Sequence, residues 1–282
     1  SGGGSAVGGA FTYNRIADTT SALLSNASMD VGNLSVVASQ PNLGASIWSL
    51  AFNLAAGGGS AGVGAGVAVN LIDAERSAVI DDSTVNLDGD LNMTSALDGE
   101  IWSLGIDAAG GGTAGVGGSF AANNINGKDE VRVSDSTVTA SGNDQTLSLD
   151  ASAGQGLMIA SLAGSITGGG TAAVGLAATF NRIAADREAI IRDSQIADFA
   201  TTSLKAGVEQ AIYAIAVAGG GAGSVAVNGA TTTNLLEGTE RAAIVGNSSR
   251  VTGGSLNLSA AEGKRTIWGL GGVVNGAGSV AV

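Results

Sequence analysis

A glycine triplet returns along this chain at a near-constant interval. The triplets begin at Gly2, Gly57, Gly110, Gly168 and Gly219. One stretch, GGGSAGVGAGVAVN at 57–70, contains the spacing Gly57-x-Gly59-x-x-Gly62 that is typical of a dinucleotide-binding loop. A phosphate-binding loop also needs a helix behind it and is needed once, whereas this pattern recurs. We therefore interpret the glycines as part of a repeat architecture.

Two further markers support a true repeat. The first marker is an asparagine, and its steps along the chain are 56, 53, 58 and 53 residues. Its members are Asn14, Asn70, Asn123, Asn181 and Asn234. The second marker moves by 56, 53, 58 and 54 residues, and its members are Asn26, Asp82, Asp135, Asp193 and Asn247. Because the two markers lengthen and shorten together, the insertions are localised within a genuine array.

The markers divide the chain into one array of five repeats of about 55 residues and the start of a sixth. The approximate repeats are 1–56, 57–109, 110–167, 168–218 and 219–275, followed by 276–282. None of them resembles the polar cap that solenoids need for solubility. We expect the array to continue in a longer chain or in an end-to-end fibre.

Within each repeat the side chains alternate with period two, which predicts half-buried strands. Strands are expected near 60–72, 77–86, 90–96 and 101–108. A chain with strands and no helical pattern connects parallel strands by coiling, so we predict an all-β, parallel β-solenoid. The usual handedness of parallel crossovers makes it a right-handed β-helix. One wide coil per repeat is the favoured arrangement, and two shorter coils also fit the spacing.

The glycine segment has two unlike faces. Val63, Val67 and Val69 share one face, which we expect to be core, and Gly62 and Gly64 share the other. A second sheet packed closely against the small-residue face is the leading interpretation, because glycine lets backbones approach. The alternative is an exposed glycine face that serves lateral association between fibres.

Large, mostly aromatic side chains recur once per repeat. They are Trp48, Trp102, Met158, Tyr213 and Trp268. Trp48 shares its face with Leu50 and Phe52, while Ser49 and Asn53 point the other way. This parity predicts an internal aromatic stack that fixes register. An exposed carbohydrate-binding platform is the alternative.

The polar markers predict turns. We expect the asparagine ladder to lie at a turn, with side-chain amides bonded from one coil to the next. Each of Asp82, Asp135 and Asp193 precedes a serine, and an Asx-type turn would offset part of their mutual repulsion. A bound Ca²⁺ is the alternative, with candidate ligands Asp81, Asp82, Asp88 and Asp90, although the spacing matches neither an EF-hand nor a GGxGxD repeat.

Opposite charges recur beyond the asparagine marker, and we expect them to form a solvated corner ladder. The members are Arg15, Asp18, Asp73, Glu75, Arg76, Asp186, Arg187, Glu240 and Arg241. A catalytic carboxylate pair of a polysaccharide-cleaving β-helix enzyme is the competing interpretation. The cluster GKDEVR at 127–132 is the one place where the pattern breaks enough to suggest it.

Composition excludes several classes of protein. The chain has no cysteine and no histidine, so disulfides, zinc–thiolate sites and Ser-His-Asp or Cys-His catalysis are ruled out. Its net charge of −12 argues against nucleic acid and anionic membranes as partners. Neither a spanning segment nor a signal peptide is recognisable, so we predict no membrane insertion and interpret the missing signal as truncation. No cofactor is expected.

The unit GGGxAGVGxxxAxN, followed by AxIxDSxV and xLxLxA, resembles the repeat regions of large secreted bacterial surface proteins. These are the filamentous-haemagglutinin-like adhesins of two-partner secretion and similar strand-repeat adhesins. The resemblance implies a structural, non-enzymatic stalk or filament outside the cell or on its surface. Its expected partners are neighbouring repeats, other copies in a fibre, and host or bacterial surface glycans or proteins. The long glycine strand departs from the short coils usual in that group.

Overall fold

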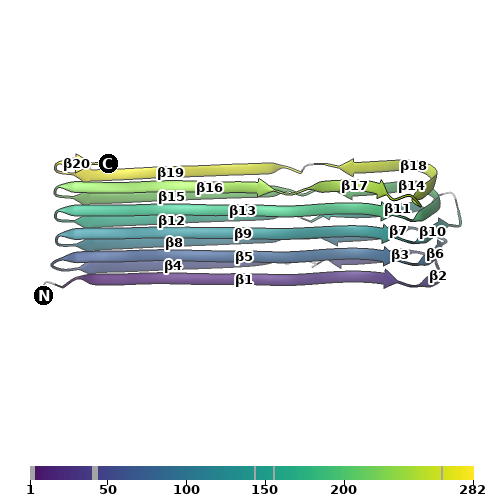
Figure 1. Ribbon diagram of the computed structural model, residues 1–282, viewed down its shortest axis with the longest axis horizontal. Helices are drawn as coiled ribbons and strands as arrows, with labels where there is room; N and C mark the ends of the chain where they lie inside the picture. The colour runs from purple at the N-terminus through teal and green to yellow at the C-terminus, as the bar shows by residue number, and fades with distance from the viewer. Residues whose placement is uncertain (1–3, 40–43, 143, 155, 262) are drawn as a thin grey trace.

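The computed structural model describes residues 4–39, 44–142, 144–154, 156–261 and 263–282, and Gly2 and Gly3 of the first triplet lie outside these ranges. Within these ranges the twenty elements are all β-strands, and every strand pairing is parallel. In the described ranges no helix has the length and apolarity needed to cross a membrane. Figure 1 shows the strands stacked into successive coils.

The strands form three sheets. The long sheet contains β1 (Ala6–Ser25), β5 (Ala61–Asp81), β9 (Ala114–Ser134), β13 (Ala172–Arg192), β16 (Val225–Glu237), β17 (Glu240–Val245) and β20 (Val280–Ala281). The head sheet contains β2 (Ser28–Val31), β3 (Leu34–Ser39), β6 (Thr84–Leu87), β7 (Leu91–Ala96), β10 (Thr137–Ala140), β11 (Thr146–Ala153), β14 (Gln195–Ala206) and β18 (Arg250–Ala260). The return sheet contains β4 (Ala45–Gly57), β8 (Gly99–Gly111), β12 (Leu157–Gly169), β15 (Gln210–Ala222) and β19 (Arg265–Ala277).

Each repeat forms one coil. The backbone of Asn14 lies beside that of Asn70, and the same register continues through Asn123 and Asn181 to Asn234. The prediction of a parallel β-solenoid is confirmed, and so is one wide coil per repeat. With about 3.3 Å per residue and 4.8 Å per coil, the 21-residue strand β5 is about 70 Å long while five stacked coils rise only about 24 Å. The array is therefore a flat slab.

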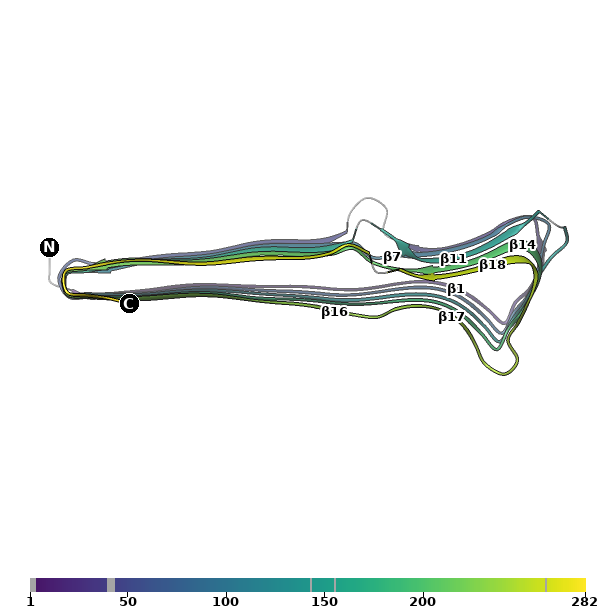
Figure 2. The same cartoon turned by 90° about the horizontal axis from the view of Figure 1, so that it is seen from above.

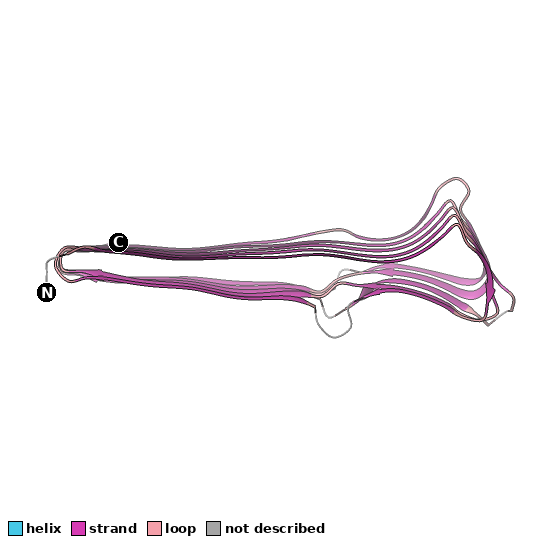
Figure 3. Cartoon of the chain, turned by 90° about the horizontal axis from the view of Figure 1, so that it is seen from below, coloured by secondary structure: helices cyan, strands magenta, loops and turns pink. Residues whose placement is uncertain are grey.

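The coil has two regions, which Figure 2 shows from above. We call the narrow region the tongue: there the first part of the long sheet lies close to the return sheet. We call the wide end the head, where the later part of the long sheet and the head sheet enclose a broader interior (Figures 2 and 3). The chain enters each coil at the tip of the tongue, turns in the head and comes back.

The head has a conventional apolar core. Ile80, Leu87, Leu91 and Met93 are fully buried, and equivalent side chains of the neighbouring coils pack above and below them. Burial of a Leu or Ile side chain stabilises a fold by about 1.5–3 kcal/mol. The alternating pattern of LNMTSA at 91–96 predicts this arrangement correctly, since Leu91 and Met93 face inward and Asn92 faces solvent.

The tongue is inverted. Gly62, Gly64 and Gly66 face the interior, whereas Val63 and Val67 lie on the outer surface, so our assignment of the valine face to the core is wrong. The reason is the small distance between the two layers. A Cβ added at Gly66 would lie 2.8 Å from the Ile106 carbonyl oxygen of the return sheet. The predicted close packing of a second sheet on the glycine face is thus present, and the glycines are enclosed.

We expected one strand to end near 72 and the next to begin near 77. The structure has no break there, because β5 runs unbroken from Ala61 to Asp81. The turn comes at Asp82, which has a positive φ of 46°. Asn26, Asp135 and Asp193 take the same left-handed conformation at 53°, 48° and 45°. Asn and Asp tolerate this region better than other non-glycine residues, which explains the second marker. In the last coil Gly246, with φ 101°, takes the position beside Asp193, and Asn247 follows it.

Candidate functional site

The asparagine ladder is the most regular polar feature of the interior. Asn70 Nδ2 donates to Asn123 Oδ1 at 2.8 Å, and the bonds before and after it in the ladder have the same length and direction. The five members are Asn14, Asn70, Asn123, Asn181 and Asn234. Asn70 also reaches across the tongue to Ser49 Oγ at 2.8 Å. The coil-to-coil bonding that we predicted is present, but the ladder lies inside long strands and not at a turn.

A second buried polar pair lies nearer the tip of the tongue. Asp107 is fully buried, and Asn53 Nδ2 donates to its Oδ1 at 2.7 Å. Burial raises the pKa of Asp107 above its ordinary value of 3.8, and hydrogen bonds from Asn53 and the Gly118 backbone offset part of that rise. Gly64 and Gly117 face this carboxylate, and a Cβ at either position would collide with it. Glycine is therefore required here to admit a polar side chain between the sheets.

The turn behind the acidic marker is held by serines. Ser83 N donates to Ser136 Oγ at 3.0 Å, and Ser136 N donates to Ser194 Oγ at 3.1 Å. Each hydroxyl in turn donates to a carbonyl two residues earlier, as Ser136 does to Ser134. The serine after each aspartate thus carries the coil-to-coil hydrogen bond. We expected an Asx-type turn made by the aspartate side chain, whereas the hydrogen bonds of this turn are made by the serine hydroxyl.

The four calcium candidates do not converge. Asp81 accepts the Ser134 hydroxyl, Asp88 Oδ1 accepts Ser141 Oγ at 2.7 Å, and Asp90 Oδ1 accepts Thr146 N at 2.7 Å. Asp82 is the left-handed turn residue. Among the described residues no three acidic side chains are grouped to hold a metal ion. The carboxylates of Asp81, Asp88 and Asp90 instead bond to the next coil.

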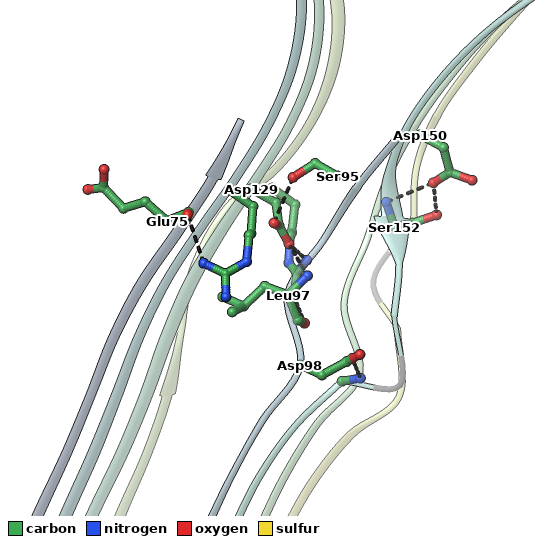
Figure 4. A network of polar contacts seen from close by, with 10 residues as sticks. Glu75, Ser95, Leu97, Asp98, Asp129, Asp150 and Ser152 are labelled. Atoms are coloured by element: carbon green, nitrogen blue, oxygen red, sulfur yellow. Dashed lines mark hydrogen bonds and ion pairs between the residues drawn. The ribbon is translucent and has the colours of Figure 1, made fainter. Parts of the chain in front are cut away.

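Part of the charged ladder is buried, contrary to the solvated corner that we expected. Asp129 and Arg187 are 0% and 2% exposed and form an ion pair inside the coil. Ser95 Oγ donates to Asp129 Oδ1 at 2.8 Å, and Arg187 Nη2 donates to the Leu97 carbonyl at 2.9 Å. Figure 4 shows Ser95, Leu97 and Asp129 meeting where the layers diverge. Burial lowers the pKa of Arg187 to about 10, so the guanidinium remains charged at neutral pH.

This pair belongs to a column of alternating charge. Arg76, Asp129, Arg187 and Glu240 occupy successive coils in register. Arg76 Nη2 reaches Asp18 at 2.6 Å, and Arg265 Nη2 reaches Glu240 Oε1 at 2.7 Å. Opposite charges next to one another in the column reduce the repulsion that identical stacked residues would have. Asp129, the most deeply buried charged residue of the GKDEVR cluster, therefore forms an internal ion pair.

The charged residues of the long sheet that do not belong to this column form a band across its outer face. Arg15 pairs with Asp73, and Arg182 pairs with Glu237 at 2.7 Å. Asn126 links the two pairs, because it donates to Asp73 and accepts from Arg182. Lys128 Nζ lies 3.1 Å from Glu130, which raises the pKa of the lysine. Glu75 and Lys128 border a groove of about 610 Å³ on this face, which Asp73 and Asp186 also line.

The aromatic column lies outside, so the predicted internal stack is wrong. Trp48, Trp102, Tyr213 and Trp268 are 71%, 39%, 42% and 47% exposed on the return sheet. Trp48 and Trp102 stack with ring centroids 5.2 Å apart and an interplanar angle of 18°. The inversion of the tongue explains this, because Asn53 and Ser103 take the interior positions of the same strands. Met158 is not a member of the column; its coil contributes Ala160.

Comparison of the chain with family models, with curated proteins and with solved structures gives no match. The fold and its surfaces are accordingly the basis for inferring function.

Proposed function

We propose that this chain is a structural segment of an extracellular or cell-surface bacterial adhesin, in which the stacked coils act as a rigid spacer and attachment scaffold. The observation that carries the proposal is the continuity of register. Every coil repeats the backbone positions of the one before it over strands of up to 21 residues. Such an array is extended by adding coils, each of which contributes about 4.8 Å of length.

The polar bonds of the interior support the role of a rigid spacer. The asparagine and serine ladders and the charge column all bond one coil to the next. In a repeat protein the stability is close to a sum of nearest-neighbour interfaces. A wide coil with many such bonds makes each interface large, which is what a rigid spacer outside the cell requires.

The same features weigh against the enzymatic alternative. A polysaccharide-cleaving site needs a pair of accessible carboxylates set apart from the repeat. Asp129 is enclosed and paired with Arg187. On the outer face, Asp73 is bonded to Arg15 and Asn126, and Asp186 accepts the Thr239 hydroxyl at 2.8 Å. These carboxylates stabilise coil-to-coil contacts.

A self-assembling filament is the second candidate, and the apolar outer faces of the tongue favour it. Val7, Trp48 and Ile166 are each more than two-thirds exposed. Extended apolar surface of this kind marks interaction sites. The glycine face that we considered for lateral association is enclosed between the sheets, so association would use these outer faces or the open strand edges at the first and last coils.

Electron microscopy of the purified 282-residue chain, combined with sedimentation velocity over a hundredfold range of concentration, separates the two candidates. A spacer segment gives discrete slabs about 70 Å long at every concentration. A filament subunit gives fibres that lengthen with concentration, and this result would reject the spacer proposal in favour of the second candidate. A calcium chelator is included in a parallel set of grids.

The location is tested separately. An antibody raised against the head should label intact cells of the source organism, and protease added to intact cells should destroy the epitope. Labelling that requires permeabilised cells would contradict a surface or extracellular role, whatever the microscopy shows.

A further inference from the structure

The aromatic column on the return sheet is interrupted once. In register, its positions are Trp48, Trp102, Ala160, Tyr213 and Trp268. The interruption falls in the third of five coils, so a large ring lies on each side of a methyl group. Around it the surface forms a groove of about 510 Å³, bordered by all four aromatic residues and by Leu104, Leu162 and Ile215.

The ring of Trp102 is held with one face free. Its indole Nε1 donates to Glu100 Oε2 at 3.3 Å, and Ser46 Oγ donates to Glu100 Oε1 at 2.9 Å. Trp48 Nε1 donates to Ser46 Oγ at 3.0 Å, so both indoles point the same way. Trp48 covers one face of Trp102. The other face of Trp102 is therefore directed along the array, toward the coil of Ala160.

The space above Ala160 has the thickness of one inserted ring. Trp102 and Tyr213 are two coils apart, which is about 9.6 Å. Aromatic rings stack with centroids roughly 4.5–7 Å apart, so one planar ring fits between two others at that separation. The interruption is a slot with an aromatic wall at either end and a methyl group as its floor.

The slot is almost free of polar partners. The serines that border it, Ser49, Ser103 and Ser161, lie on interior positions of their strands, and Ser49 accepts a bond from the asparagine ladder. The nearest carboxylate that the column uses, Glu100, is occupied by Ser46 and Trp102. A sugar would need hydrogen-bond partners for its hydroxyl groups. The surroundings select an apolar planar ring, and the net charge of −12 disfavours an anionic one.

We propose that the slot between Trp102 and Tyr213, above Ala160, binds a small planar aromatic molecule that is neutral or cationic. This site is independent of the spacer function, since it uses the outer face of the return sheet and none of the interior ladders. It also differs from an extended carbohydrate platform, because Trp48 and Trp102 stack face to face and the opening is confined to the coil of Ala160.

The test is isothermal titration of the intact chain with 2-naphthol, a neutral bicyclic aromatic. Ala160→Trp fills the slot and should weaken binding at least tenfold. Its folding is checked by thermal unfolding, where we expect no loss because the substitution completes the surface column. Ala108→Trp adds the same ring to the outer face of β8 away from the slot and should leave affinity within twofold. Tyr213→Leu removes one wall and should weaken binding about tenfold.

Three results would overturn the proposal. Saturable binding that Ala160→Trp leaves unchanged would place the probe elsewhere. Absence of saturable binding up to the solubility of 2-naphthol would show that the slot does not accept a ring. Self-association of the wild-type chain that Ala160→Trp abolishes would assign the slot to an aromatic side chain of a second copy and not to a small molecule.

Discussion

Asn70 and Asn123, one coil apart, are joined by a side-chain hydrogen bond of 2.8 Å, and both are buried between the two layers of the tongue. Every interior member of this ladder uses its Nδ2 as donor and its Oδ1 as acceptor, so the chain of bonds has one direction. A ladder of this kind satisfies buried amides without water. It also fixes register, because a coil displaced by one residue would replace the bond with a clash.

Asn123→Ala should lower the free energy of unfolding by about 2–4 kcal/mol, because it leaves Asn181 Oδ1 without its Asn123 donor and leaves Asn70 Nδ2 with Ser49 as its one remaining acceptor. Asn92→Ala, at an exposed position of β7, is the control and should change stability by less than about 0.5 kcal/mol. Urea denaturation followed by circular dichroism measures both. Equal effects of the two variants would contradict a stabilising ladder.

Gly66→Ala should destabilise the chain by about 1–3 kcal/mol, because its Cβ would lie 2.8 Å from the carbonyl oxygen of Ile106 and the layers of the tongue would have to separate. Gly168→Ala is the matched control, since a Cβ there meets nothing within 4 Å. That variant should be neutral or gain up to about 1 kcal/mol from reduced freedom of the unfolded chain. Thermal unfolding of both variants decides whether close approach of the sheets is the constraint on glycine.

Asp107→Asn should stabilise the chain at pH 7. The pKa of Asp107 is raised in the folded state because the carboxyl group is buried. Between the unfolded value near 3.8 and the higher folded value, the folded state binds more protons, so stability falls as pH rises through that window. Asparagine keeps the acceptor for Asn53 and removes the charge.

The gain from Asp107→Asn should therefore shrink as the pH is lowered toward 3.8, which denaturation at a series of pH values will measure. Asp30→Asn, at an exposed carboxylate of β2, serves as the control for a general change in net charge. A stabilisation by Asp107→Asn that is independent of pH would show that desolvation of the carboxylate is not its cause.

Asp129→Ala should cost about 3–5 kcal/mol, because it leaves the buried guanidinium of Arg187 without its counter-charge. Lys128→Ala, which breaks a pair at the surface, should cost less than about 1 kcal/mol. Replacing both members, as Asp129→Leu with Arg187→Met, should be less harmful than the single change. If the double variant is as unstable as Asp129→Ala, the loss comes from packing and not from the unpaired charge.

The sequence predicts the architecture of this chain well, because the spacing between repeated residues equals the offset between paired strands in a solenoid. The steps between Asn14, Asn70 and Asn123 are the strand offsets of the structure. Parity also separates the two faces of each strand correctly, since Gly62 and Val63 do point in opposite directions. The head follows the ordinary rule that apolar side chains lie inside.

Parity alone does not say which face is inside. In the tongue the usual rule fails because the layers are too close to hold valine or tryptophan, and glycine, serine and asparagine fill the interior instead. One signal was available: Asn70 has the same parity as Gly62 and Gly64, and a ladder of identical amides can satisfy itself in the absence of water. Ala160 was missed since Met158, two residues earlier on the same face, fits the spacing of large side chains.

The most direct test of the stacked-coil account is a distance between spin labels at Ser28 and Arg250. The chain has no native cysteine, so Ser28→Cys with Arg250→Cys gives two defined sites, both exposed. These positions are linked in register through Thr84, Thr137 and Gln195, by four coil-to-coil steps, although 222 residues separate them. Double electron–electron resonance should give a single distribution centred near 20 Å, from four steps of about 4.8 Å. A distribution centred near 40 Å would mean two coils per repeat and would contradict the account.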